Sequence, residues 1–231
     1  MPPERRRNAG GGDIDLPAVL SQGADELGVH LDESALRRLL DYLALLRKWN
    51  AVYNLTAIRD PAQILVQHLL DSLAVIPPLR RRLDLAHASI ADVGSGAGLP
   101  GIPLAIVHPG AHLISIEPVG KKTAFQRQVC AELALTNIEV HSTRAEALTR
   151  ATDLVICRAF ASLADFLDAA VGLVGPATLL AAMKGQRAGL DVEVAALPAD
   201  CAVEIEPLQV PFQPAERHLV LIRRTGAARA H

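Results

Sequence analysis

The sequence predicts an α/β fold in which a doubly wound, mostly parallel seven-stranded sheet carries helices on both faces and follows a helical extension. Three observations support this prediction. From residue 89 onward, short apolar runs alternate with helical stretches, the order that builds parallel sheets. A glycine-rich turn, GSGAG at 94–98, directly follows the first of these runs. The chain closes with two strand-like runs and no helix between them, which indicates an antiparallel hairpin at one edge of the sheet.

The first third of the chain is predicted to be helical. A helix near residues 16–28 comes first. A second follows Asp32, a good N-cap, and places its leucines at helical spacing with charged residues on the opposite side. A third begins with Asp60 as its cap and a proline in its first turn, and it is expected to end at Pro77-Pro78.

The remaining two thirds alternate between strand and helix. The strand-like runs are residues 89–93, 112–117, 138–142, 153–157, 178–185, 201–209 and 217–223. The helical stretches between them are residues 102–107, 120–135, 144–148, 162–174 and 186–196. We therefore expect a disordered tail over 1–12, a helical region over 13–80 and a ligand-binding domain over 81–231. The ligand of such a sheet binds outside the carboxyl ends of its strands.

Composition restricts the class of protein. Half of the 231 residues are apolar and the formal net charge is −2, so a large core is expected and any polyanion must meet a local basic patch. No membrane span is expected, and the basic start MPPERRRNAGGG lacks the apolar region of a signal peptide. Cys130, Cys157 and Cys201 are far apart, which argues against disulfides and metal sites. They are expected to be buried thiols of a cytoplasmic protein.

The glycine turn by itself fits two cofactors. Gly96, Gly98 and Gly101 match the nicotinamide-dinucleotide pattern, and Glu117 at the end of the next strand could bind a ribose diol. However, Asp92 would repel a pyrophosphate, whereas it suits the ammonium of a methionine group. The terminal hairpin is also typical of S-adenosylmethionine-dependent methyltransferases. The pattern favours a methyltransferase; a nicotinamide oxidoreductase and a noncatalytic RNA-binding module remain as alternatives.

Eight segments from residue 48 onward make the hypothesis more specific. In order they are KWNAVYNLTAIRDP, HLLDSLAV, ADVGSGAGLPGIPLAI, GKK, RAEAL, CRAFASL, MKGQ and ERHLVLIRR. Together they resemble the bacterial glucose-inhibited division protein B family, now called RsmG, over nearly the whole chain from about residue 32. That family methylates N7 of a guanosine in 16S ribosomal RNA with S-adenosylmethionine, so the resemblance implies the same reaction and cofactor here.

The resemblance also implies a cofactor site. Gly94 and Leu99 would contact the cofactor in the glycine loop, Ala145 and Glu146 would flank the adenine, and Arg158 would lie at the pocket. The expected cofactor-binding set is Asp92, Gly94, Gly96, Gly98, Leu99, Glu117, Ala145, Glu146 and Arg158.

The chemistry predicts no general base. Guanine N7 carries an in-plane lone pair and no proton, so the protein has only to hold the reactants in line. His68, Asp71 and Ser72 lie at i, i+3 and i+4 of one predicted helix and therefore share a face, unlike a hydrolase triad. This segment is expected to pack over the cofactor pocket, to support the substrate, or to have a purely structural role. We therefore expect no catalytic residue.

Candidates for RNA contact are basic residues near the strand ends. Arg158 and Lys184 could hold guanine O6, although Arg158 is favoured as a ligand-orienting group. Lys121, Lys122 and Arg127 are favoured for phosphates because their helix starts at the ligand edge. Few aromatics are present, so recognition should depend on the shape of the rRNA. The expected partner is 16S rRNA or a small ribosomal subunit particle, bound by a monomer.

Overall fold

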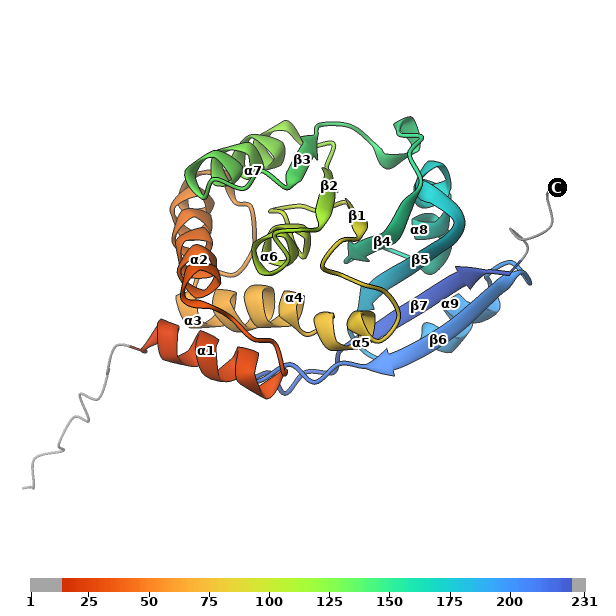
Figure 1. Cartoon of the computed structure of the whole chain (residues 1–231). Helices are drawn as coiled ribbons and strands as arrows, with labels where there is room; N and C mark the ends of the chain where they lie inside the picture. Colours follow the sequence, from red (N-terminus) through yellow and green to blue (C-terminus); the bar gives the residue numbers. More distant parts are fainter. Residues whose placement is uncertain (1–13, 226–231) are drawn as a thin grey trace, which may run out of the picture.

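The computed structural model describes residues 14–225, so the expected tail over 1–12 lies outside the described residues. At the centre is a seven-stranded sheet with the order β3-β2-β1-β4-β5-β7-β6 (Figure 1). Neighbouring strands from β3 to β5 are parallel, and β7 is antiparallel to both β5 and β6. This confirms the predicted fold class. The strands are β1 Ser89–Val93, β2 His112–Ile116, β3 Ile138–His141, β4 Thr152–Arg158, β5 Val174–Lys184, β6 Cys201–Pro207 and β7 His218–Arg224.

Helices cover both faces of the sheet, as the alternation of its side chains requires. In β1, Ile90 packs into one core cluster while Ala91 and Val93 pack into the other. The first cluster includes α1 Leu16–Glu26, α2 Glu33–Tyr53, the segment 61–80, α6 Gly101–Val107 and α7 Gly120–Glu132. The second includes the 3-10 turn Ala145–Ala147, α8 Leu163–Ala170, the 3-10 turn Val171–Leu173 and α9 Leu190–Ala195. The N-terminal helices therefore share one core with the sheet.

The N-terminal helices begin where the sequence indicates. The Asp32 side chain accepts a hydrogen bond from Ala35 N, and the Asp60 side chain accepts one from Gln63 N. After α1, Gly28 adopts a φ of 67°, the left-handed conformation typical of a residue that ends a helix.

Several boundaries differ from the prediction. The third helix is interrupted: α3 Pro61–Ile64 leads into a π-helical turn, Leu65–Leu70, and then α4 Asp71–Leu73. Pro77 and Pro78 do not end a helix but occupy the first turn of α5 Ile76–Arg80. Proline is tolerated there because backbone N–H groups in the first turn make no hydrogen bond within the helix. The predicted helix over 162–174 ends at Ala170, and β5 starts four residues earlier than expected because Gly175 and Pro176 join the strand.

The segment Pro61–Arg80 is long and apolar enough, by length and composition alone, to cross a membrane, but 72% of it is buried inside the protein. It contacts both α1 and α2. Of the cysteines, only Cys157 is buried, so the expectation of three buried thiols was wrong for Cys130 and Cys201, which are half-buried.

Candidate functional site

The glycine turn forms a loop at the carboxyl end of β1. Gly94, Gly96 and Gly98 adopt φ values of 68°, 58° and 87°, a conformation that side chains with a Cβ rarely reach. A Cβ on Gly94 would also stand 3.2 Å from the Phe160 ring. The loop thus needs glycine for its path as well as for the space in front of it.

Side chains from three separate elements hold this loop in place. The Glu117 carboxylate accepts a hydrogen bond from Gly96 N at 2.9 Å, and Gln126 of α7 donates to Gly96 O at 2.7 Å. The Tyr42 hydroxyl of α2 donates to Ala97 O at 2.8 Å. All three side chains are buried, so the loop has its shape before any ligand arrives.

Asp92 lies below the loop, fully buried. Its Oδ2 accepts a hydrogen bond from Gly101 N at 2.8 Å, whereas its buried Oδ1 has no partner among the described residues. Burial raises the pKa of Asp92 from 3.8 to about 7, against the opposing effects of the Gly101 N–H and the Arg158 charge. A buried acceptor without a partner costs free energy. The carboxylate is therefore suited to a cationic group of a ligand.

Beside the loop lies a hollow of about 360 Å³, which we call the loop hollow. Gly94, Ala145 and Glu146 of the predicted cofactor set line it, together with Arg144 and Phe160. Ala145 is buried under α8, while the Glu146 side chain is exposed. The remaining residues that line the loop hollow are Val93, Ile116, Pro118, Thr143, Asp165, Asp168 and Ala169.

The other predicted cofactor residues take supporting positions. Leu99 is buried in the core, and Glu117 uses its two oxygens to accept hydrogen bonds from Gly96 N and Val119 N. Gly96 and Gly98 belong to the loop's backbone rather than to the lining of the hollow. Arg158, the last residue of β4, lines a second hollow instead.

This second hollow, of about 370 Å³, we call the arginine hollow. His68, Asp71, Arg158, Lys184 and Arg217 all line it. Residues 158–160, at the carboxyl end of β4, separate it from the loop hollow: Arg158 and Ala159 line the arginine hollow and Phe160 lines the loop hollow. The two hollows are therefore neighbours at the carboxyl edge of the sheet, the edge where such folds bind ligands.

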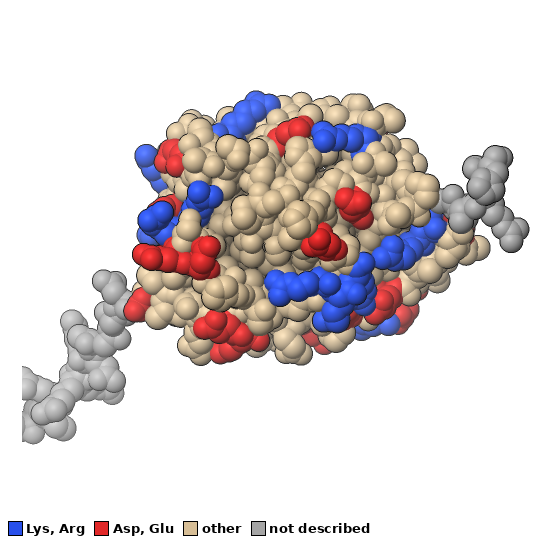
Figure 2. Space-filling view, viewed as in Figure 1, with Lys and Arg blue, Asp and Glu red and all other residues tan. Residues whose placement is uncertain are grey.

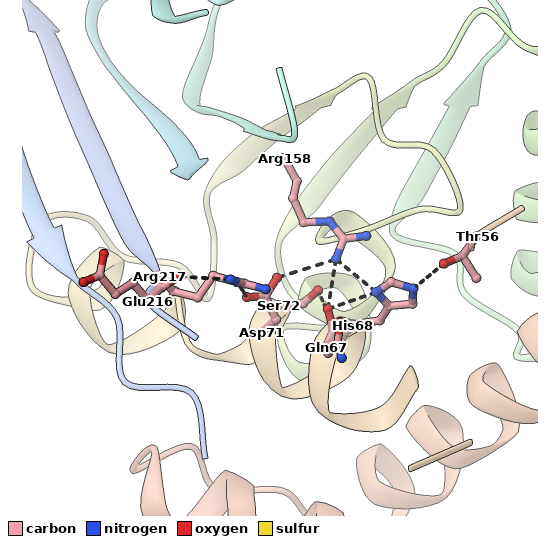
Figure 3. Close-up of polar contacts among 8 residues, drawn as sticks. All are labelled: Thr56, Gln67, His68, Asp71, Ser72, Arg158, Glu216 and Arg217. Carbon is pink, nitrogen blue, oxygen red and sulfur yellow. Dashed lines mark hydrogen bonds and ion pairs between the residues drawn. The ribbon is translucent and has the colours of Figure 1, made fainter. Parts of the chain in front are cut away.

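A polar network forms the wall of the arginine hollow (Figure 3). Arg158 Nη1 lies 3.3 Å from Gln67 O, 3.3 Å from His68 Nδ1 and 3.5 Å from Asp71 Oδ2. Arg217 Nε donates to Asp71 Oδ1 at 3.0 Å from the opposite side. Every one of these Arg158 contacts uses Nη1, so its Nε and Nη2 donors remain unengaged within residues 14–225.

Burial and the Arg158 charge lower the pKa of His68 to about 4, so its ring is neutral near pH 7. His68 Nε2 lies 2.9 Å from Thr56 Oγ1, and the Ser72 hydroxyl donates to the backbone oxygen of His68. The side chains of His68, Asp71 and Ser72 do not form a base–nucleophile chain in the described structure. Burial raises the pKa of Asp71, opposed by the charges of Arg158 and Arg217.

The basic residues predicted to contact RNA are mostly engaged. Lys184 Nζ pairs with Glu193 at 2.8 Å and donates to Phe160 O. On α7, Lys121 donates to Tyr53 O, Lys122 lies 3.6 Å from Glu117, and Arg127 donates to Val140 O. None of the three α7 residues lines either hollow.

Two further basic clusters, residues 80–82 and 223–224, lie farther away. Arg81 and Arg82 pair with Glu206 and Glu204 of β6, and Figure 2 shows basic and acidic side chains intermixed along that edge. Arg224 pairs with Asp200 at the end of β7, which is antiparallel and therefore ends at the edge opposite the two hollows. No cluster able to hold a metal ion occurs within the described part of the chain.

Sequence reasoning missed several residues of the site. Arg217 lies in the segment ERHLVLIRR, and that resemblance was the signal that could have singled it out. Tyr42, Gln126 and Phe160 carry no local signal, because only tertiary contacts bring them to the glycine loop.

This chain is similar to known proteins in sequence and in fold. A family model described as rRNA small subunit methyltransferase G matches residues 35–220. This chain is similar to two proteins named ribosomal RNA small subunit methyltransferase G. The one from Methylibium petroleiphilum is 46% identical, with 91% of this chain and 96% of the relative covered. The one from Burkholderia thailandensis is 50% identical, with 89% of this chain and 90% of the relative covered.

Solved structures share the fold. A SAM dependent methyltransferase from Aquifex aeolicus superimposes with a TM-score of 0.52 at 16% identity, covering 71% of this chain and 93% of that one. A ribosomal protein L11 methylase from Lactobacillus delbrueckii subsp. bulgaricus gives a TM-score of 0.52 at 16% identity, covering 67% and 76%. At this identity the likeness concerns the fold alone.

Proposed function

Since the chain belongs to the rRNA small subunit methyltransferase G family, we propose that it transfers a methyl group from S-adenosylmethionine to N7 of a guanosine in 16S ribosomal RNA. One observation carries the proposal: a preformed glycine loop at the end of β1 borders one hollow, and an arginine-lined hollow adjoins it across residues 158–160. One hollow suits the cofactor and the other suits a base.

The residues around the loop hollow fit S-adenosylmethionine. The space in front of Gly94, which a Cβ would fill, suits its methionine part. Asp92 does not line the hollow, and its buried, unpartnered Oδ1 is proposed to meet the ammonium group from beneath the loop. Glu117 is the acid for the ribose hydroxyls, because each of its oxygens keeps a second lone pair, and Ala145 and Glu146 flank the adenine side. When bound, this cofactor supplies an electrophilic methyl group on a positively charged sulfur.

The arginine hollow is proposed to hold the guanine. The unengaged Nε and Nη2 donors of Arg158 can hold O6, which leaves N7 free to react. Lys184 is a weaker candidate, because its ammonium already contacts Glu193 and Phe160 O. Since N7 has no proton to lose, these residues bind and orient, and no side chain needs to act as a base.

Charge in the arginine hollow suits a reaction in which positive charge moves onto the base. His68 is neutral near pH 7, so it adds no positive charge beside the purine. Asp71 sits between Arg158 and Arg217, and its carboxylate partly offsets their two charges. Fixed groups of this kind stabilise charge without reorganising during the reaction.

The wider setting follows from the same proposal. The domain of 81–231 binds the cofactor, the helical region of 13–80 completes the site through residues 42, 68 and 71, and the enzyme works in the cytoplasm. We expect a monomer that acts on 16S rRNA or on a small subunit particle.

The decisive experiment maps methylation of 16S rRNA by mass spectrometry in cells with and without this protein. We expect one guanosine to lose a methyl group at N7 when the protein is absent. Titration of the purified chain with S-adenosylhomocysteine and with NAD tests the cofactor separately. Binding of NAD alone would point to an oxidoreductase, and binding of neither to a noncatalytic RNA-binding module.

A further inference from the structure

A third hollow, of about 390 Å³, opens at the carboxyl end of α2 and carries three cationic side chains, Arg47, Lys48 and Arg59. We call it the α2 hollow. All three residues are exposed, and none has an acidic side chain within 4.0 Å among residues 14–225. Their one side-chain hydrogen bond in the described chain runs from Arg59 Nη2 to Asn54 Oδ1 at 2.8 Å.

This arrangement differs from the basic clusters named above. Arg81, Arg82 and Arg224 have carboxylate partners, and Lys184 is paired with Glu193. Like charges gathered round one hollow repel each other and so reduce stability slightly. An anionic ligand would remove that repulsion.

The α2 hollow adjoins the arginine hollow through one loop, residues 54–60. Arg59 faces the α2 hollow, and the preceding residue, Ile58, lines the arginine hollow. Asn50 fixes this loop: its amide donates to Ile58 O at 3.0 Å, and its Oδ1 accepts from Thr56 N at 2.9 Å. Thr56 in turn contacts His68 in the wall of the arginine hollow at 2.9 Å. A strand of RNA that leaves the arginine hollow over this loop meets the three cations.

We propose that the α2 hollow binds the backbone phosphate of an RNA nucleotide flanking the methylated guanosine. Arg47 and Arg59 can each form two parallel hydrogen bonds to phosphate oxygens, while Lys48 acts as a point charge. This inference rests on the proposed function, since it assigns the partner of the same site.

The test uses Arg59→Gln and Arg47→Gln, which remove a charge but keep a polar side chain. Arg37→Gln is the matched control: it is an exposed arginine on the same helix without an acidic partner in the described chain, about 15 Å from Arg47 by helical rise. Binding is measured to 16S rRNA, free or in small subunit particles, whichever form the wild-type enzyme methylates. Titrations are repeated across a range of salt concentrations.

Each hollow variant should lower the slope of log K against log salt by about 0.7 to 0.9, the effect of one lost phosphate contact, and weaken binding roughly fivefold at 0.1 M salt. KM for RNA should rise while kcat and the affinity for S-adenosylhomocysteine stay unchanged. Arg37→Gln should alter none of these. A purely structural role would not change the salt slope.

Two outcomes would overturn the inference, and they are distinguishable. If Arg59→Gln and Arg47→Gln keep the wild-type salt slope while the wild type methylates 16S rRNA, the α2 hollow does not hold a phosphate and the proposed function stands. If the wild-type enzyme binds S-adenosylhomocysteine but methylates no 16S rRNA in either form, the proposed function itself fails and the inference fails with it.

Discussion

Replacing Asp92 by asparagine tests both the burial of this carboxyl group and its proposed role toward the cofactor. The side chains have nearly the same shape, and Oδ of asparagine can still accept the hydrogen bond from Gly101 N, which Asp92 accepts at 2.8 Å. The substitution removes the charge that burial makes costly. It also removes the negative group that the proposal pairs with the ammonium of S-adenosylmethionine.

The size of the effect follows from the pKa of Asp92, which burial raises from 3.8 to about 7 in the folded protein. Between these values the folded state holds a proton that the unfolded chain has released, so stability falls as pH rises. Each pH unit in that window costs about 1.4 kcal/mol, and the full loss is roughly 4 kcal/mol above pH 7. An asparagine at this position does not titrate, so the Asp92→Asn variant would carry no such dependence.

The assay is urea unfolding of the ligand-free wild type and Asp92→Asn at pH 5, 6, 7 and 8. The difference in unfolding free energy, variant minus wild type, should grow by about 2 to 3 kcal/mol from pH 5 to 7 and level off above. In parallel, S-adenosylhomocysteine should bind the variant more weakly, most clearly above pH 7. Parallel stability curves for the two proteins would show that Asp92 ionises normally, and the reasoning would be wrong.

Three further predictions concern the site. Gly94→Val should abolish S-adenosylhomocysteine binding, because the added side chain enters the loop hollow and opposes a φ of 68°. Calorimetry measures the binding and circular dichroism checks that the chain is folded; normal binding would mean that the loop is not the cofactor site. His68→Ala and Asp71→Asn should each slow single-turnover methylation by less than the roughly 10² to 10⁴-fold expected of a lost general base, once the rates are corrected for the cofactor and RNA binding constants. Rates should be nearly flat from about pH 6.5 to 8.5. A basic limb in the wild-type pH profile that disappears in either variant would contradict attack by guanine N7. Tyr42→Phe loses the hydrogen bond to Ala97 O, so it should reduce stability by about 1 kcal/mol and weaken S-adenosylhomocysteine binding several-fold, whereas an unchanged affinity would remove Tyr42 from the loop's support.

Several features of the site could be read from the sequence because they depend on neighbours along the chain. The left-handed glycines, the acid after the second strand and the helix caps at Asp32 and Asp60 are local signals. The final pair of strands predicted the antiparallel edge. The roles of Gly94, Leu99, Ala145, Glu146 and Arg158 came from the resemblance to a family rather than from such rules.

The π-helical turn over 65–70 and the entry of Pro77 into a new helix could not be read locally. A helix-forming segment without breakers has the same pattern whether or not packing widens one of its turns. That turn belongs to the segment that brings His68 and Asp71 to Arg158, about 90 residues farther along the chain.

The sequence alone determined which residue types stand at the ends of the strands, since a strand's period and a turn's glycines act over a few residues. Only the tertiary structure decided how those residues are used. Lys184 and the α7 cations look available in the sequence but are engaged by carboxylates or carbonyls, while Arg217 gains its position from the distant Asp71. The physical reason is that charge and hydrogen bonding act through space. A cation's availability depends on which acid the folded chain places within about 4 Å of it, and no local pattern carries that information.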